Sequence, residues 1–247
     1  MKANNSARCL HEILKTAMNC PNPDVTIAHA LAPALKVDNP DLEKYKYGDF
    51  FRLIREVEED VSTLKNIDEL EDYLSAIQEV SGIFLSVRMF QDSWSSIYPL
   101  IQQSRSLTNI NSCALFLEQR DKYPTLEKEA LEGYLQDCQA MIEDVLSSDL
   151  EDDIKIFLVI KLRDICTAIE NYHLGGTKKS KRVIEENLGG LLLRSYGLAL
   201  EEKNKPIYSR LFTYFLTFGG VLDTAANVQG YLVPKITEVV QLLLSSH

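Results

Sequence analysis

Apolar residues recur at three- and four-residue steps along most of the 247-residue chain, which is the spacing of one face of an α-helix. The pattern is clearest over residues 48–65, 70–87, 131–146 and 154–172, where charged residues fill the positions between the apolar ones. The strict alternation of apolar and polar residues that is typical of a half-buried strand does not occur over any length. We therefore predict an all-α fold, a multi-helix bundle of roughly nine to eleven helices arranged mostly as antiparallel helical hairpins.

Capping residues predict where several of these helices begin. Asn66 followed by Glu69 has the spacing of a capping box and predicts a helix start at this point. Thr125, directly after Pro124, is expected to cap the helix that covers 131–146.

Glycine pairs mark two further features of the C-terminal half. The pair Gly175-Gly176 predicts a helix end, after which Thr177 is placed to cap the next helix. The pair Gly219-Gly220 falls inside a helical pattern from about 205 to 228. Because glycine is unfavourable within a helix, we expect a kink or the close approach of a second helix there. Beyond residue 230 the apolar spacing predicts a final helix.

The domain boundary is marked only weakly. No low-complexity linker divides the chain, and we place the boundary at the turn-like segment 121–124. This gives an N-terminal helical subdomain over 1–122 and a C-terminal one over 123–247. A single continuous domain is the alternative.

Composition and charge narrow the class of protein. With a formal net charge of −10, the surface as a whole disfavours binding to nucleic acid or to a membrane surface. The N-terminus lacks the apolar stretch of a signal peptide, and the longest uncharged apolar run, 211–222, is too short to span a membrane. We expect a cytoplasmic protein without a cofactor.

Five cysteines are present, an odd number without any C-x-x-C pair. This favours a reducing compartment over a disulfide framework or a zinc site. Cys138 and Cys166 fall on apolar helical stripes, where a free cysteine packs as a small hydrophobic residue.

Charge is distributed unevenly along the chain. Residues 118–153 contain twelve acidic and three basic residues, a net charge of −9. Residues 154–210 contain eleven basic and six acidic residues, a net charge of +5. Either these segments pack side by side and their charges compensate, or they form two docking faces for a partner.

Two pairs of carboxylates suggest a metal site. The pairs are Glu56-x-x-Glu59 and Glu69-x-x-Asp72, which resemble the paired acidic motifs of all-α nucleotide pyrophosphatases. Mg²⁺ prefers oxygen ligands, and two helices in a hairpin could direct these four carboxylates toward one ion. The spacing departs from that family, because only nine residues separate the two pairs. The same residues also fit the solvated faces of two ordinary helices.

One basic run falls in the first turn of a predicted helix, where the helix dipole makes positive charge mildly unfavourable. It consists of Lys178, Lys179, Lys181 and Arg182. The run is a candidate contact for an anion or an acidic partner, helped by the backbone N–H groups of the preceding glycines. The alternative is a solvated turn whose charge is balanced by Glu185 and Glu186 on the same helix.

The segment 154–193 is similar to a pattern found in uncharacterised helical bacterial proteins. The pattern combines the helix end at Gly175 with the later sequence Leu188-Gly189-Gly190. This resemblance implies no activity and no catalytic residues, and it favours a bacterial source and an accessory role.

The sequence therefore favours a non-enzymatic helical protein-interaction module, such as an adaptor, a regulator or an immunity-type accessory protein. Its expected partner is another protein or a second copy of the chain. The alternative is a metal-dependent all-α enzyme that acts on nucleotides through the two carboxylate pairs.

Overall fold

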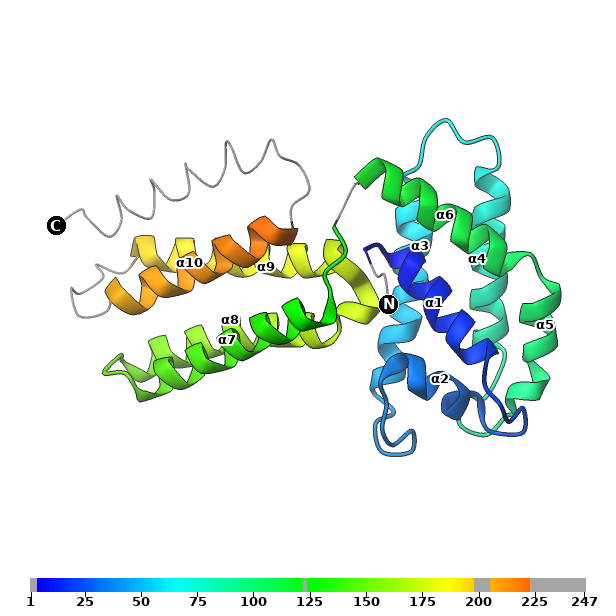
Figure 1. Ribbon diagram of the computed structural model, residues 1–247, viewed down its shortest axis with the longest axis horizontal. Coiled ribbons are helices and arrows are strands. Elements are labelled where there is room, and N and C mark those ends of the chain that lie inside the picture. The colour runs from blue at the N-terminus through cyan, green and yellow to red at the C-terminus, as the bar shows by residue number, and fades with distance from the viewer. Residues whose placement is uncertain (1–3, 122–123, 198–204, 223–247) are drawn as a thin grey trace. The chain divides into compact units, whose positions relative to one another are not determined.

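The computed structural model describes residues 4–121, 124–197 and 205–222. These residues form ten α-helices and one short 3-10 helix, η1 (Trp94–Ser96), without a β-strand (Figure 1). The predicted all-α fold is thus confirmed. The chain divides into two compact units, one of Met1–Lys122 with His173–Gly176 and one of Tyr123–Tyr172 with Thr177–His247. Whether 1–122 and 123–247 fold as independent domains stays a prediction.

The first unit is built around its N-terminal helix. Helix α1 packs against α2, α3 and α6, while α4 packs against α3 and α6 (Figure 1). The helices of this unit are α1 (Ser6–Met18), α2 (Ile27–Leu35), α3 (Lys46–Ser62), α4 (Leu70–Leu85), α5 (Tyr98–Gln103) and α6 (Ser106–Asp121). The α3–α4 pair is the hairpin that the apolar spacing predicted.

Two polar side chains fix the start of α1 against α6. The Asn5 side-chain oxygen accepts a hydrogen bond from the Arg8 backbone N–H at 2.9 Å and so caps the helix. The Asn5 amide also donates to the buried carbonyl of Ala114 at 3.1 Å. Arg8 donates through Nε to Glu118 at 2.9 Å and through its guanidinium to Asn111 at 2.6 Å. Side-chain hydrogen bonds therefore cap the first turn of α1 and join it to α6.

The second unit contains four long helices. They are α7 (Lys128–Ser147), α8 (Asp152–Glu170), α9 (Tyr172–Gly197) and α10 (Lys205–Leu222). Helices α7 and α8 form an antiparallel hairpin (Figure 1), and α7 also contacts α10. Helix α9 approaches α8 at Gly190, where an added Cβ would lie 3.3 Å from the Lys161 side chain.

Glycine in α10 permits a close helix approach. A Cβ built on Gly219 would lie 3.4 Å from Cγ2 of Ile184 on α9. Of the two explanations offered for the Gly219-Gly220 pair, the structure supports the close approach of a second helix. The helix predicted beyond residue 230 lies outside the described residues.

Helix α9 consists of two helical stretches that meet at Gly176. The φ of 61° and ψ of −160° at this residue lie outside the helical region, in a conformation that only glycine adopts without strain. A non-helical residue thus lies at the predicted glycine pair, but the helix expected to end there, α8, already ends at Glu170 with Asn171 as its C-cap residue. Thr177 follows Gly176 in the chain. Its hydroxyl lies 2.6 Å from the Tyr172 hydroxyl and donates to the Pro124 carbonyl.

Two predicted helix starts are wrong. Asn66 has a left-handed φ of 61°, and α4 begins only at Leu70, after Glu69 as the N-cap residue and without a side-chain cap bond. Helix α7 likewise begins at Lys128 rather than after Thr125. Tertiary contacts explain the second error, because the preceding segment 124–126 is held by hydrogen bonds to Tyr172 and Thr177.

Within the described ranges, no helix has both the length and the apolar character that crossing a membrane requires.

Replacing Asn5 tests the anchor of α1. We expect Asn5→Ala to lower the free energy of unfolding by about 1–3 kcal/mol, because it removes a helix cap and leaves the buried Ala114 carbonyl without its donor. Asn5→Ser retains a capping oxygen and is expected to lose less. Urea denaturation followed by circular dichroism measures both. A loss below about 0.5 kcal/mol for Asn5→Ala, typical of surface substitutions, would contradict this account.

Candidate functional site

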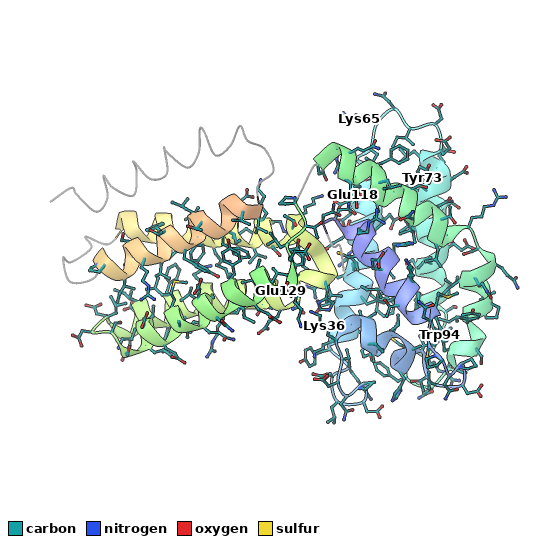
Figure 2. All side chains as sticks on the ribbon, viewed as in Figure 1. Lys36, Lys65, Tyr73, Trp94, Glu118 and Glu129 are labelled. Atoms are coloured by element: carbon teal, nitrogen blue, oxygen red, sulfur yellow. The ribbon has the colours of Figure 1, made fainter. Side chains whose placement is uncertain are left out.

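An open, polar cleft of about 430 Å³ lies in the first unit between α4 and the start of α6. Tyr73, labelled in Figure 2, is one of its wall residues, and its ring packs 5.9 Å from that of Phe116. The buried Ser106 hydroxyl donates to Glu79 at 2.6 Å and holds this carboxylate in place. The charged groups that line the cleft are Glu69, Asp72, Glu79 and Arg105.

Only two of the four predicted metal-binding carboxylates line this cleft. Glu69 and Asp72 line the cleft, whereas Glu56 and Glu59 lie on α3 and are not among its lining residues. Over the described part of the chain, no group of three or more His, Cys, Asp or Glu side chains is arranged to hold a metal ion. The four-carboxylate site stays a prediction, and the structure places only half of it in one cleft.

The basic run lies at the start of the helical stretch that follows Gly176. Lys181 is 3.8 Å from Glu185, and Arg182 is 3.7 Å from Glu186, both as i,i+4 ion pairs. Lys178 and Lys179 are half-buried and also have interaction partners. The charge of the run is therefore compensated at least in part along its own helix, as the solvated-turn interpretation expected. Contact with an anion or an acidic partner stays a prediction.

The opposite charges of successive segments also meet within the second unit. Asp144 on the acidic helix α7 forms an ion pair with Arg210 on α10. This pair borders a groove of about 390 Å³ between the two helices, which Tyr134 and Tyr214 also line. This ion pair agrees with the explanation that the acidic and basic segments pack side by side and compensate each other's charge.

Helix α8 carries apolar residues on two faces. Its inner face is buried against the rest of the unit through Ile154, Leu158, Val159, Leu162, Ile165, Cys166 and Ile169. On the outer face, the side chains of Ile156 and Ile160 are 61% and 51% exposed. These two residues are four positions apart and therefore share one side of the helix. We call Ile156 and Ile160 the outer α8 patch.

Exposed isoleucines that share one helix face form apolar surface that a partner protein can cover. Fully burying an isoleucine side chain contributes about 1.5–3 kcal/mol, so covering two half-exposed ones contributes roughly 2–3 kcal/mol. The sequence analysis did not single out Ile156 and Ile160, because it followed only the inner stripe. The signal was present in the run from Ile154 to Ile160, where five of the seven residues are Ile, Leu or Val.

Two buried cysteines belong to the hairpin of the second unit, Cys138 on α7 and Cys166 on α8. Cys138 is fully buried and Cys166 is 9% exposed, so the expectation that both pack as small apolar residues agrees with their burial. The Cys138 thiol donates to the Leu162 carbonyl on α8 at 3.3 Å. The Tyr214 hydroxyl donates to the Tyr134 carbonyl at 2.8 Å.

The neighbouring Cys166 side chain and burial raise the pKa of the Cys138 thiol. Burial raises the pKa of Tyr214, whose hydroxyl therefore stays protonated.

No protein-family model, no curated protein and no solved structure matches this chain.

Cysteine accessibility provides a test of this packing. We expect iodoacetamide to modify Cys20, which is partly exposed, first in the native protein and Cys166 slowly. Cys9, Cys113 and Cys138 are fully buried, and burial raises the pKa of Cys113 to about 12. They should react only after denaturation, because the thiolate is the reactive form. Peptide mass spectrometry at successive times measures the order, and early labelling of Cys138 would show that the α7–α8 interface is wrong.

Proposed function

We propose that this protein is a non-enzymatic helical interaction module and that it binds a protein partner through the outer α8 patch. The observation that carries the proposal is the exposure of Ile156 and Ile160 on a helix whose opposite face is already buried. Exposed apolar residues that share a helix face are characteristic of surfaces at which another protein docks.

The chemistry of the patch indicates what kind of surface covers it. Two isoleucines four residues apart fit the apolar stripe of an amphipathic helix, which packs side chains between those at i and i+4. The partner is therefore a helical protein segment with an apolar stripe, on another protein or on a second copy of this chain.

The cysteines are consistent with the cellular setting that the proposal requires. All five are free, as is usual for proteins of a reducing compartment. We place the protein in the cytoplasm, in the role of an adaptor, regulator or immunity-type accessory factor of a bacterial cell.

Charge substitutions on the patch test the proposal. We expect Ile156→Glu combined with Ile160→Glu to abolish partner binding, because a helix stripe that docks there would have to bury two carboxylates. Stability should change by no more than about 0.5 kcal/mol per residue, since both side chains are exposed in the isolated chain. The matched control is Leu85→Glu, at a position on α4 that is 70% exposed.

The measurement uses a photo-reactive amino acid at position 160 or at position 85, introduced into the full chain within its native cells. A protein or a second copy that cross-links from position 160, and not from position 85, supports the proposal when the double Glu variant loses it. Equal cross-linking from both positions, or retention of the same partner by the double Glu variant, would overturn it.

A further inference from the structure

The exposed side of α8 continues beyond the outer α8 patch with a charged residue at each end. Asp153 lies three residues before Ile156, and Arg163 lies three residues after Ile160. Steps of three, four and three residues keep these four side chains on one face of the helix, and all four are exposed. Asp164 is turned about 100° away from Arg163 and so lies beside this face rather than on it. We call the four residues the α8 stripe.

The α8 stripe is complementary to itself when a second copy of the helix runs in the opposite direction. With a twofold axis between Ile156 and Ile160, each Ile156 lies opposite the Ile160 of the second copy. Each Asp153 then lies opposite the Arg163 of the second copy. A closed twofold interface requires this kind of order, because residue i must contact residue j while j contacts i. The isoleucines of both copies cover one another, and an ion pair flanks them at each end.

The same residues disfavour a parallel pair. A parallel arrangement would place the two Asp153 carboxylates opposite each other, and the two Arg163 guanidinium groups likewise. Glu151 and Asp152 are also exposed, so this end of α8 is acidic as a whole. Because like charges that face each other across an interface are unfavourable, the charges of the stripe select the antiparallel arrangement.

We propose that the chain forms a homodimer in which the α8 stripes of two copies pack against each other in antiparallel orientation. This inference rests on the proposed function, since it uses the outer α8 patch as the docking surface, and it names a second copy of the chain as the partner. The charge complementarity of the stripe carries the choice of that partner. The steps of three, four and three residues are also those of the apolar seam between two coiled helices.

The length of the stripe indicates how strong the dimer is. The helix from 153 to 163 is about 15 Å long, so a single helix pair buries less than the roughly 1,200 Å² of a standard interface between proteins. Interfaces of this size are weak, and we expect a dissociation constant of roughly 10–100 μM. The concentration of the chain therefore sets the fraction that is dimeric.

Sedimentation equilibrium of the purified full chain, over concentrations on both sides of this dissociation constant, measures the association. We expect a reversible equilibrium between monomer and dimer. Ile156→Glu combined with Ile160→Glu should leave only monomer, because carboxylates would replace the isoleucines at the centre of the interface. Leu85→Glu, at the exposed position on α4, is the matched control and should leave the equilibrium unchanged.

Exchange of the end charges tests the antiparallel arrangement. Asp153→Arg alone or Arg163→Asp alone turns both ion pairs of the dimer into like-charge pairs, and should raise the dissociation constant about tenfold or more. The two substitutions together restore opposite charges, and should return the dissociation constant to within about threefold of that of the natural chain. A parallel pair would gain nothing from the exchange.

Circular dichroism checks that each variant is folded, because Asp153 lies in the first turn of α8, where an acidic residue stabilises the helix. Arg163→Asp leaves that turn unchanged and keeps the test informative if Asp153→Arg unfolds the helix. A chain that stays monomeric over the whole concentration range overturns the inference. A dimer that the double Glu variant retains, or that the double charge exchange weakens as much as either single substitution, overturns it equally.

The failure of this inference can be distinguished from the failure of the proposed function. If the purified chain is monomeric while position 160 cross-links a different protein in cells, the homodimer is wrong and the docking surface stands. If the chain is monomeric and position 160 captures no protein, both are wrong.

Discussion

Each helix of this protein has an apolar stripe that is stable only when another helix covers it. In the α3–α4 and α7–α8 hairpins the next helix in the chain provides this cover, whereas α1 is covered largely by α6, which is distant in the sequence. Polar contacts then select one arrangement among those that burial allows. The capping of α1 by Asn5, which also bonds to α6, is an example in which a single side chain performs both tasks.

Helix α8 has two different faces. Its inner face is buried against the rest of the unit, and its outer face carries the exposed isoleucines. Docking at the outer face uses the rigidity of the same helix, and a rigid surface loses less entropy when a partner binds.

The candidate chemistry could be predicted from the sequence only where it depends on neighbours along one helix. The pairing of Lys181 with Glu185 and of Arg182 with Glu186 follows directly from i,i+4 spacing. A metal site of four carboxylates would have required α3 and α4 to direct these side chains toward one ion, which depends on how the two helices pack. The structure instead places Glu69 and Asp72 beside α6, which the sequence did not show as a neighbour of α4.

The sequence by itself determined that the chain is helical, that α7 and α8 form a hairpin and that the chain breaks its helix at Gly176, because these depend on local spacing and backbone freedom. Tertiary structure decided where α7 begins, since the hydrogen bonds of segment 124–126 to Tyr172 and Thr177 overrode the cap expected at Thr125. It also decided which of the isoleucines of α8 are covered. That coverage depends on how neighbouring helices are rotated about their axes, and a helix periodicity alone does not specify that rotation.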